Sequence, residues 1–328
     1  MAPSPSGKAE VCKTFITSSN LVGASIKNQP AVTAGFFVIM VFCSIARDKL
    51  TRDNGSLLDF LTPTLLSMTV VLAACAGLLA GLLGIGGGVI LVPFFLWLFK
   101  EAGMPPQLIV HSAFGTSLCI IMPTAISSTL GHLRRRNVDW HQVFYLALGG
   151  GFGALLGSSL AAMLSGSILR AFFGAMQIAI GLKMLITPAQ RDLASRLEPK
   201  SLHLILVGLA GGLFSSFFGV GGGVVAVPLM LLLLRMQVQR AVGNSCPLVF
   251  TSALFGTLSY AYHGLSVATD FPYSFGYINL LVVLIVTPIS MLFAQIGAGL
   301  ASQVGQRKLV GVFALLLILV GAKLIFQG

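Results

Sequence analysis

Charged residues are scarce in this chain. Asp, Glu, Lys and Arg make up only 9% of its 328 residues, whereas soluble domains average about 25%. Apolar residues make up 56%, and mean hydropathy is +0.94. Several apolar runs reach the roughly 20 residues that a helix needs to cross a bilayer, and the alternating segments of a membrane β-barrel are lacking. We therefore expect an all-α, multi-pass integral membrane protein that lies in a lipid bilayer, the plasma or inner membrane.

Acidic residues are the rarer charged type. The nine Asp and Glu residues fall in the N-terminal tail, in loops or at the ends of apolar runs. Proton pumps and cation carriers usually keep a carboxylate inside the membrane. The placement of the acids therefore favours an anionic or neutral substrate.

Reactive and metal-binding patterns are also lacking. The five cysteines include no CxxC pair, and the five histidines show no metal-ligand spacing. No nucleophile–base pair is evident, and the triple glycines described below lack the Lys and Ser/Thr that follow in a nucleotide-binding loop. We expect no metal site, no cofactor and no enzymatic activity.

The formal net charge of +11 comes from basic residues in short loops between apolar runs. Because they form no single patch, we expect no nucleic-acid partner; the sequence carries no signal for a particular oligomeric state. Ten basic residues fall on one predicted side, including Arg134, Arg135 and Arg136, and five on the other. The richer side is the predicted cytoplasmic side. If the two glycine-rich hairpins returned without crossing, the count would become nine against six.

The chain divides into four regions. Residues 1–61 hold a tail, either a targeting segment or a cytoplasmic extension, and an extra span at 31–46. A first transmembrane repeat (62–187) and a second (202–328) flank a cytoplasmic linker at 188–201. The predicted segments of the repeats are 62–83, 88–99, 107–131, 141–163, 167–187, 202–218, 223–234, 240–262, 276–301 and 308–326.

The two repeats match in sequence. "GLLGIGGGVILVP" (81–93) and "SFFGVGGGVVAVP" (216–228) share glycines, a valine and a proline at an offset of 135 residues. "FGTSL" (114–118) matches "VGNSC" (242–246), and 169–186 matches 309–326. Because each half has five segments, the second should be inverted relative to the first, as in many secondary transporters. The alternative is a duplicated membrane scaffold without transport activity.

The triple glycines predict breaks between helices. Glycine is unfavourable inside a helix, and Pro93 and Pro228 suit the beginning of one. A helix N-terminus offers free N–H groups and about half a positive charge, which favours anions. We therefore predict substrate-binding glycines at Gly86, Gly87, Gly88, Gly221, Gly222 and Gly223. The alternative is that these glycines only allow close helix packing.

Neutral hydrogen-bonding side chains follow each break. Thr116 and Ser117 match Asn244 and Ser245, and all four could donate to a weakly held oxyanion, so they complete the predicted site. If the glycines bind substrate, Gly87→Ala and Gly222→Ala should weaken binding while the melting temperature of the substrate-free protein stays near wild type.

With its paired GxGGGxxxxP stretches, the following "GTS" and "GNS", and its five-plus-five layout, the chain resembles the TauE/SafE family over about residues 62–326. The resemblance implies a transporter of sulfite, sulfonates or related organosulfur anions. The two repeats predict that it works by alternating access between inverted halves. An anion channel and a non-transporting scaffold remain the alternatives. Asn244, where the first half has Thr116, departs from the repeat.

Overall fold

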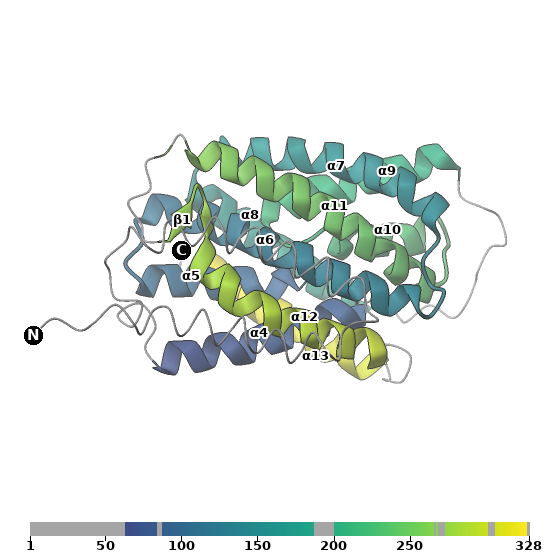
Figure 1. Ribbon diagram of the computed structural model, residues 1–328, viewed down its shortest axis with the longest axis horizontal. Coiled ribbons are helices and arrows are strands. Elements are labelled where there is room, and N and C mark those ends of the chain that lie inside the picture. The colour runs from purple at the N-terminus through teal and green to yellow at the C-terminus, as the bar shows by residue number, and fades with distance from the viewer. Residues whose placement is uncertain are drawn as a thin grey trace, which may run out of the picture.

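The computed structural model describes residues 63–83, 87–186, 200–265, 267, 273–300 and 306–326. The predicted span at 31–46, most of the linker and Gly86 lie outside these residues. The described part is almost entirely helical (Figure 1). Its elements are α4 (Pro63–Leu83), α5 (Gly88–Glu101), α6 (Pro106–Leu133), α7 (Trp140–Ala162), α8 (Gly166–Ile186), α9 (Ser201–Phe218), α10 (Gly223–Leu232), α11 (Val238–Leu265), β1 (Ser274–Phe275), β2 (Ile278–Asn279), α12 (Leu280–Leu300) and α13 (Gln306–Phe326).

The glycine-rich stretches separate a long helix from a short one, as the sequence predicts. Gly87, with φ at 72°, precedes α5, and Gly219 and Gly221 between α9 and α10 have φ at 67° and 86°. This left-handed backbone suits glycine and strains most other residues. The short helices have 14 and 10 residues, so at 1.5 Å per residue they extend about 21 and 15 Å, less than the roughly 30 Å hydrocarbon core.

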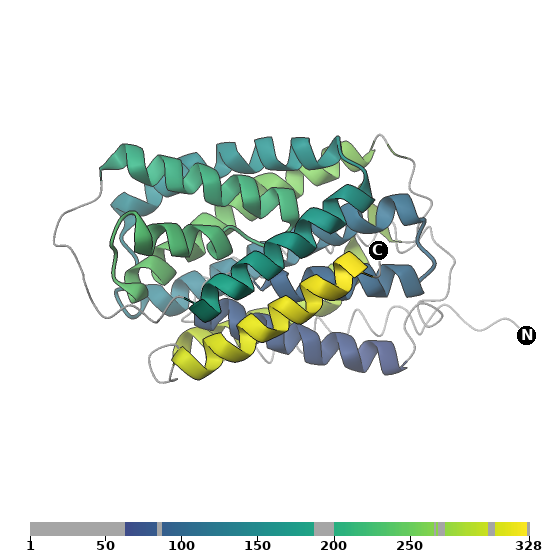
Figure 2. The ribbon, with the colours of Figure 1, turned by 180° about the vertical axis from the view of Figure 1, so that it is seen from behind.

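Helices from the two halves of the sequence pack on each other. The most extensive contacts join α7 to α9 and α4 to α12, while α6 packs on α11 and α8 on α13. Figure 1 shows α7, α9 and α11 along one side and α4 and α12 along the other, with α6 between them. Figure 2 shows α8 and α13 side by side on the opposite face. Each of these contacts therefore joins a helix of the first half to a helix of the second half.

Glycines allow these helices to approach closely. A β-carbon added at Gly149 or Gly153 of α7 would collide with carbonyl oxygens of α9, and one at Gly208 of α9 would collide with the carbonyl oxygen of Leu146. Gly77 and Gly81 of α4 meet the backbone of α12 in the same way. Small residues at helix crossings are typical of membrane proteins.

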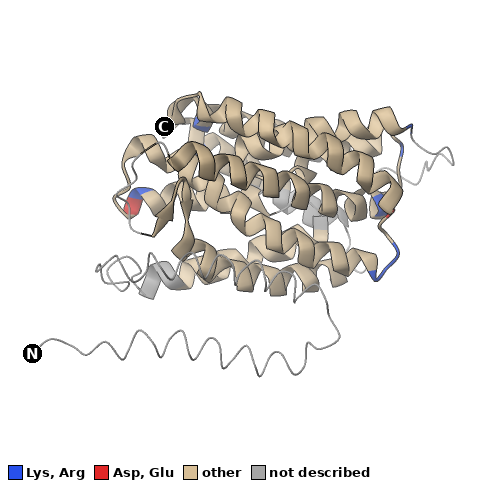
Figure 3. Cartoon of the chain, turned by 45° about the horizontal axis from the view of Figure 1, so that its top comes forward, with Lys and Arg blue, Asp and Glu red and all other residues tan. Residues whose placement is uncertain are grey.

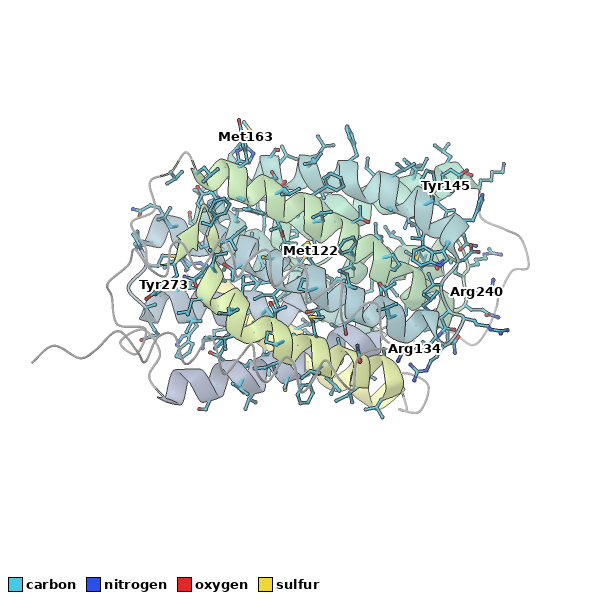
Figure 4. All side chains as sticks on the ribbon, in the orientation of Figure 1. Met122, Arg134, Tyr145, Met163, Arg240 and Tyr273 are labelled. Carbon is cyan, nitrogen blue, oxygen red and sulfur yellow. The ribbon has the colours of Figure 1, made fainter. Side chains whose placement is uncertain are left out.

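The long axis of the bundle runs between two distinct ends. Figure 4 shows Arg134 and Arg240 at one end, here called the arginine end, and Met163 and Tyr273 at the other, here called the hairpin end. The Lys and Arg residues visible in Figure 3 lie at the ends of the bundle and not along it. Arg135 donates to the carbonyl oxygens of Ala298 and Gly299 in the last turn of α12, so this arginine stabilises a helix C-terminus.

Five of the described helices are long and apolar enough to cross a membrane: α6, α7, α9, α11 and α12. Large apolar side chains such as Phe144, Phe152 and Leu292 are exposed on their outer faces, as expected of lipid-facing positions. One boundary prediction is wrong. The span predicted at 276–301 begins only at Leu280, because residues 274–279 form a hairpin in which Ser274 pairs with Asn279 and Gly276 has φ at 58°.

Candidate functional site

The two glycine breaks meet inside the bundle. A β-carbon added at Gly88 would lie 2.6 Å from the carbonyl oxygen of Val220 and 2.7 Å from Cδ1 of Ile121. Gly219 lies equally close to the backbone of Phe114 on α6. Ile121 precedes Met122, which lies about midway between the two ends in Figure 4. The N-termini of α5 and α10 thus converge near the middle of the molecule.

The two breaks have the same local construction. A β-carbon at Gly87 would lie 2.7 Å from the carbonyl oxygen of Ala76, and one at Gly222 would lie 2.7 Å from that of Gly211. These residue pairs are matched at the offset of 135 found in the sequence. Both glycines therefore pack against the helix that precedes their own break, and this role is structural.

Each break also ends in a helix N-terminus. In α5, the N–H groups of Ile90 and Leu91 are the first to bond back, to the carbonyl oxygen of Gly87. In α10, those of Val225 and Ala226 bond back to Gly222. An α-helix leaves its earlier N–H groups without an acceptor of its own. Two sets of backbone donors, each with about half a positive charge, are thus buried close to one another.

Two serine hydroxyls without a partner belong to helices that pack against the breaks, Ser117 on α6 and Ser215 on α9. Ser117 is 0% exposed and Ser215 is 1% exposed, and neither Oγ atom has a hydrogen-bond partner. Ser117 shares a face of α6 with Phe114 and Ile121, the residues that contact the two breaks. The Cβ atom of Ser215 would lie 3.5 Å from a β-carbon at Gly222. Buried hydroxyls are usually bonded, so each of these two leaves one hydrogen bond unmade in the structure.

Thr116 and Asn244, which the sequence predicts as substrate donors, accept backbone hydrogen bonds in matched places. Asn279 N–H, just ahead of α12, donates to Thr116 Oγ1 over 2.9 Å. Asp139 N–H, just ahead of α7, donates to Asn244 Oδ1 over 2.8 Å. Asn244 Nδ2 also donates to Gln142 Oε1 over 3.0 Å. We call the first contact the hairpin-end latch and the second the arginine-end latch.

The glycines of "GTS" and "GNS" complete the latches. A β-carbon at Gly115 would lie 2.9 Å from the carbonyl oxygen of Tyr277, and one at Gly243 would collide with that of Asn137. Tyr277 and Asn137 each lie two residues before the residue whose N–H group donates in the latch, Asn279 and Asp139. The "GTS" of the first half therefore packs against the start of α12 in the second half. The "GNS" of the second half packs against the start of α7 in the first half, at the other end of the bundle.

The other predicted site residues separate into two groups. Gly87, Gly88, Gly221, Gly222 and Gly223 lie buried at the breaks, and Ser117 is buried on α6. Ser245 is also buried, but its hydroxyl donates to the carbonyl oxygen of Val242 over 2.8 Å. Gly86 is outside the described residues.

Sequence reasoning missed Ser215, although "FSSFFG" places two hydroxyls just before the second break. The matching residue of the first half is Ala80, whose Cβ lies 3.4 Å from a β-carbon at Gly87. The hydroxyl is therefore specific to the second break, and the comparison of the repeats was the signal that could have identified it.

Gln177 was also missed. Pro93 has no N–H group, so it cannot bond the carbonyl oxygen of Val89, four residues earlier. Gln177 Nε2 of α8 donates to that oxygen over 3.1 Å. The matching residue of α13 is Leu317, so the two breaks differ here as well.

Comparisons with known proteins agree with this architecture. Residues 68–324 match the family described as sulfite exporter TauE/SafE. The chain is 27% identical over 276 residues to a probable membrane transporter protein, YunE, of Bacillus subtilis, which covers 79% of this chain and 97% of that protein. It is 28% identical over 264 residues to a probable membrane transporter protein of Haemophilus influenzae, covering 80% and 99% of the two chains.

A probable membrane transporter protein of Xylella fastidiosa is 32% identical over 203 residues, which is 61% of this chain and 76% of that one. No solved structure matches the chain. Because the family match extends over most of the sequence and the described helices include five that could cross a membrane, the chain belongs to the sulfite exporter TauE/SafE family of membrane transport proteins.

Proposed function

We propose that the chain moves a small organosulfur anion, such as sulfite or a sulfonate, by way of the two glycine breaks. The observation that carries the proposal is the convergence of the N-termini of α5 and α10. It is supported by the unpartnered hydroxyls of Ser215, near Gly222, and of Ser117, on the face of α6 that contacts the breaks. Backbone N–H groups and hydroxyls are the donors that a weakly held oxyanion requires. The family description, sulfite exporter, supports the substrate class.

Two inverted halves would give this site its access to both sides of the membrane. The reciprocal contacts of α7 with α9 and of α12 with α4 support the inverted relationship. In each half, the chain turns back at the glycine break, so the short helix ends at the same end of the bundle at which the long helix before it begins. There α5 leads to the beginning of α6, and α10 leads to the beginning of α11. The two short helices then extend from the site towards opposite ends, as broken helices do in inverted-repeat transporters.

The two latches would act as alternating gates in this mechanism. Both are closed here, and Ser117, Ser215 and the described glycines of the breaks are buried. Opening the hairpin-end latch would separate α12 from α6 and give the anion access to the site from that end. Opening the arginine-end latch would separate α7 from α11 and give access from the other end. A channel would need both open together.

Proteoliposome uptake of labelled sulfite and of methanesulfonate tests this function, with Ser117→Ala, Ser215→Ala and a matched control, Ser158→Ala. The Ser158 hydroxyl is equally buried but bonds its own helix at Ala154 O. Loss of a hydrogen bond to a charged ligand costs about 1.5–3 kcal/mol, so KM should rise at least about tenfold in the first two variants. The control should keep the wild-type KM.

Stability measurements separate binding from packing in the same variants. Because the hydroxyls of Ser117 and Ser215 have no partner, their removal should leave the melting temperature of the substrate-free protein unchanged or raise it. Wild-type protein that transports neither anion, or variants with unchanged KM, would contradict the proposed function.

A further inference from the structure

Two buried side chains make matched hydrogen bonds away from the breaks and the latches. His132 Nε2 of α6 donates to the carbonyl oxygen of Gly81 in α4 over 3.2 Å, and the Tyr260 hydroxyl of α11 donates to that of Ser216 in α9 over 3.1 Å. The two donors match at the offset of 128 that relates "FGTSL" to "VGNSC", and the two acceptors match at the offset of 135 that relates the glycine-rich stretches. We call the first contact the histidine tie and the second the tyrosine tie.

The ties and the latches complement each other at the two ends of the bundle. His132 lies eleven residues after Ile121, so it is about 16 Å from the breaks towards the arginine end. At this end the latch joins α7 to α11, and the histidine tie joins α4 to α6. At the hairpin end the latch joins α12 to α6, and the tyrosine tie joins α9 to α11. Because α4 packs on α12 and α7 on α9, each of these helix pairs is bonded to α6 or α11 at both ends.

The two ties differ in the chemistry of their donors. In water a tyrosine hydroxyl keeps its proton up to about pH 10, whereas histidine takes up a second proton below about pH 6.5. Nε2 carries the hydrogen of the neutral His132 ring, because the Gly81 carbonyl oxygen only accepts. Nδ1 is buried without a partner, and the residue is 2% exposed. A proton on Nδ1 would therefore bury a donor without an acceptor and a positive charge without a counter-charge, which is unfavourable.

The surroundings of His132 offer no group that would stabilise this charge. Arg135, three residues further along α6, acts on it as a like charge. Of the two acids among the described residues, Glu101 ends α5 and Asp139 accepts from N–H groups at the start of α7. On the halves of the neighbouring helices that lie nearer the arginine end, α12 has no titratable residue, and the others have Cys75 of α4, Lys183 of α8, His203 of α9, and Arg240 and Cys246 of α11.

We propose that a proton on His132 weakens the histidine tie and favours opening of the arginine end, so that the pH on this side regulates access to the breaks. The charged ring regains water only when α6 and α4 separate. The tyrosine tie gives the hairpin end no such response. This inference rests on the proposed opening of the two ends in turn, but it concerns their control and does not depend on which anion is carried.

The test measures opening directly, in proteoliposomes without substrate. In a background without the native cysteines, Ala298→Cys places a thiol on α12 at a buried position that contacts Gly81 and Gly131. A membrane-impermeant maleimide added from the side of the arginine end should label it faster as the pH falls below about 6.5, by up to about tenfold per pH unit. Because thiol reactivity itself changes with pH, each rate is divided by that of the exposed Arg240→Cys at the same pH.

Three variants assign the response to His132. His132→Gln keeps an N–H donor for the Gly81 carbonyl oxygen, and His132→Tyr introduces the residue type of the matched position. Neither side chain titrates in this range, so both variants should label slowly at every pH. His132→Phe has no donor and should label faster than these two at every pH.

The reciprocal variant transfers the response to the other end. Tyr260→His should make labelling of Ser158→Cys from the side of the hairpin end increase as the pH falls. Ser158 of α7 matches Ala298 at the offset of 140 that relates 169–186 to 309–326, and it is equally buried. The melting temperature in detergent shows whether Tyr260→His is folded, since its ring is 0% exposed.

The comparison of His132 with its variants decides the question even if Tyr260→His does not fold. A relative rate that increases as the pH falls with His132, and stays constant in His132→Gln and His132→Tyr, supports the inference. A rate independent of pH with His132, or an equal increase in these two variants, overturns it. Neither result depends on uptake of sulfite or methanesulfonate, so a failure of the proposed function is recognised separately.

Discussion

At the residue scale, the glycines of the two breaks have a packing role, which the sequence analysis gave only as the alternative to substrate binding. Methyl groups at Gly87 and Gly222 would each lie 2.7 Å from a backbone oxygen of the preceding helix. The expectation that Gly87→Ala and Gly222→Ala leave the melting temperature near wild type is therefore wrong on steric grounds. Their effects on binding cannot be separated from effects on folding, which is why the serines are the better probes.

Gly87→Ala should lower stability more than Gly103→Ala. Both positions have positive φ, 72° and 75°, but a β-carbon at Gly103 would meet nothing within 4 Å. Gly103→Ala therefore measures backbone strain alone, about 1–2 kcal/mol, whereas Gly87→Ala adds overpacking of about 1–3 kcal/mol. Thermal unfolding in detergent would compare the two. Equal melting temperatures would contradict the close approach of Gly87 to α4.

At the scale of elements, the latches connect helices that are far apart in sequence. Thr116→Val should remove the hydrogen bond from Asn279 N–H to Thr116 Oγ1, a loss of about 1–3 kcal/mol for a buried group, and should open the hairpin end preferentially. Thr116→Ser keeps an acceptor and serves as the control. Asn244→Ala should open the arginine end instead. Accessibility of single cysteines beside each latch would report the two openings.

The latch prediction has a clear contrary result. If Thr116→Val and Asn244→Ala raise labelling at the same end, or at both ends equally, the latches do not gate opposite sides. Unchanged labelling in both variants, with folding intact, would mean that the contacts only hold the bundle together.

The elements also show what the sequence can and cannot predict. The triple glycines and the prolines that follow them predicted both short helices, because their backbone preferences are local. The hairpin at 274–279 was missed, since each strand has two residues and the turn lies within an apolar run. The backbone contacts of Thr116 and Asn244 could not be predicted, because their partners lie 163 and 105 residues away. Only tertiary packing brings these groups together.

At the scale of the whole molecule, the charge count and the structure agree on which loops share an end. Arg134 and Arg240 lie at one end and Met163 at the other. The positive-inside rule predicts that the arginine end faces the cytoplasm. Arg134→Cys and Arg240→Cys should react with a membrane-impermeant thiol reagent only from the cytoplasmic side, and Met163→Cys only from the opposite side. Labelling of Arg134→Cys and Met163→Cys from one side would contradict this topology.

The central claim, that an anion passes between the two glycine breaks, is tested most directly at Ser117. In a background whose five native cysteines are replaced by alanine, Ser117→Cys introduces one thiol on the face of α6 that contacts both breaks. A methanethiosulfonate reagent that carries a sulfonate should label it when added from either side, and a reagent that carries a trimethylammonium group should not. Methanesulfonate should slow the labelling, while a variant with cysteine at Ser158 should show no such protection. A transport-competent Ser117→Cys protein that labels with neither reagent, or labels at a rate independent of methanesulfonate, would contradict the account.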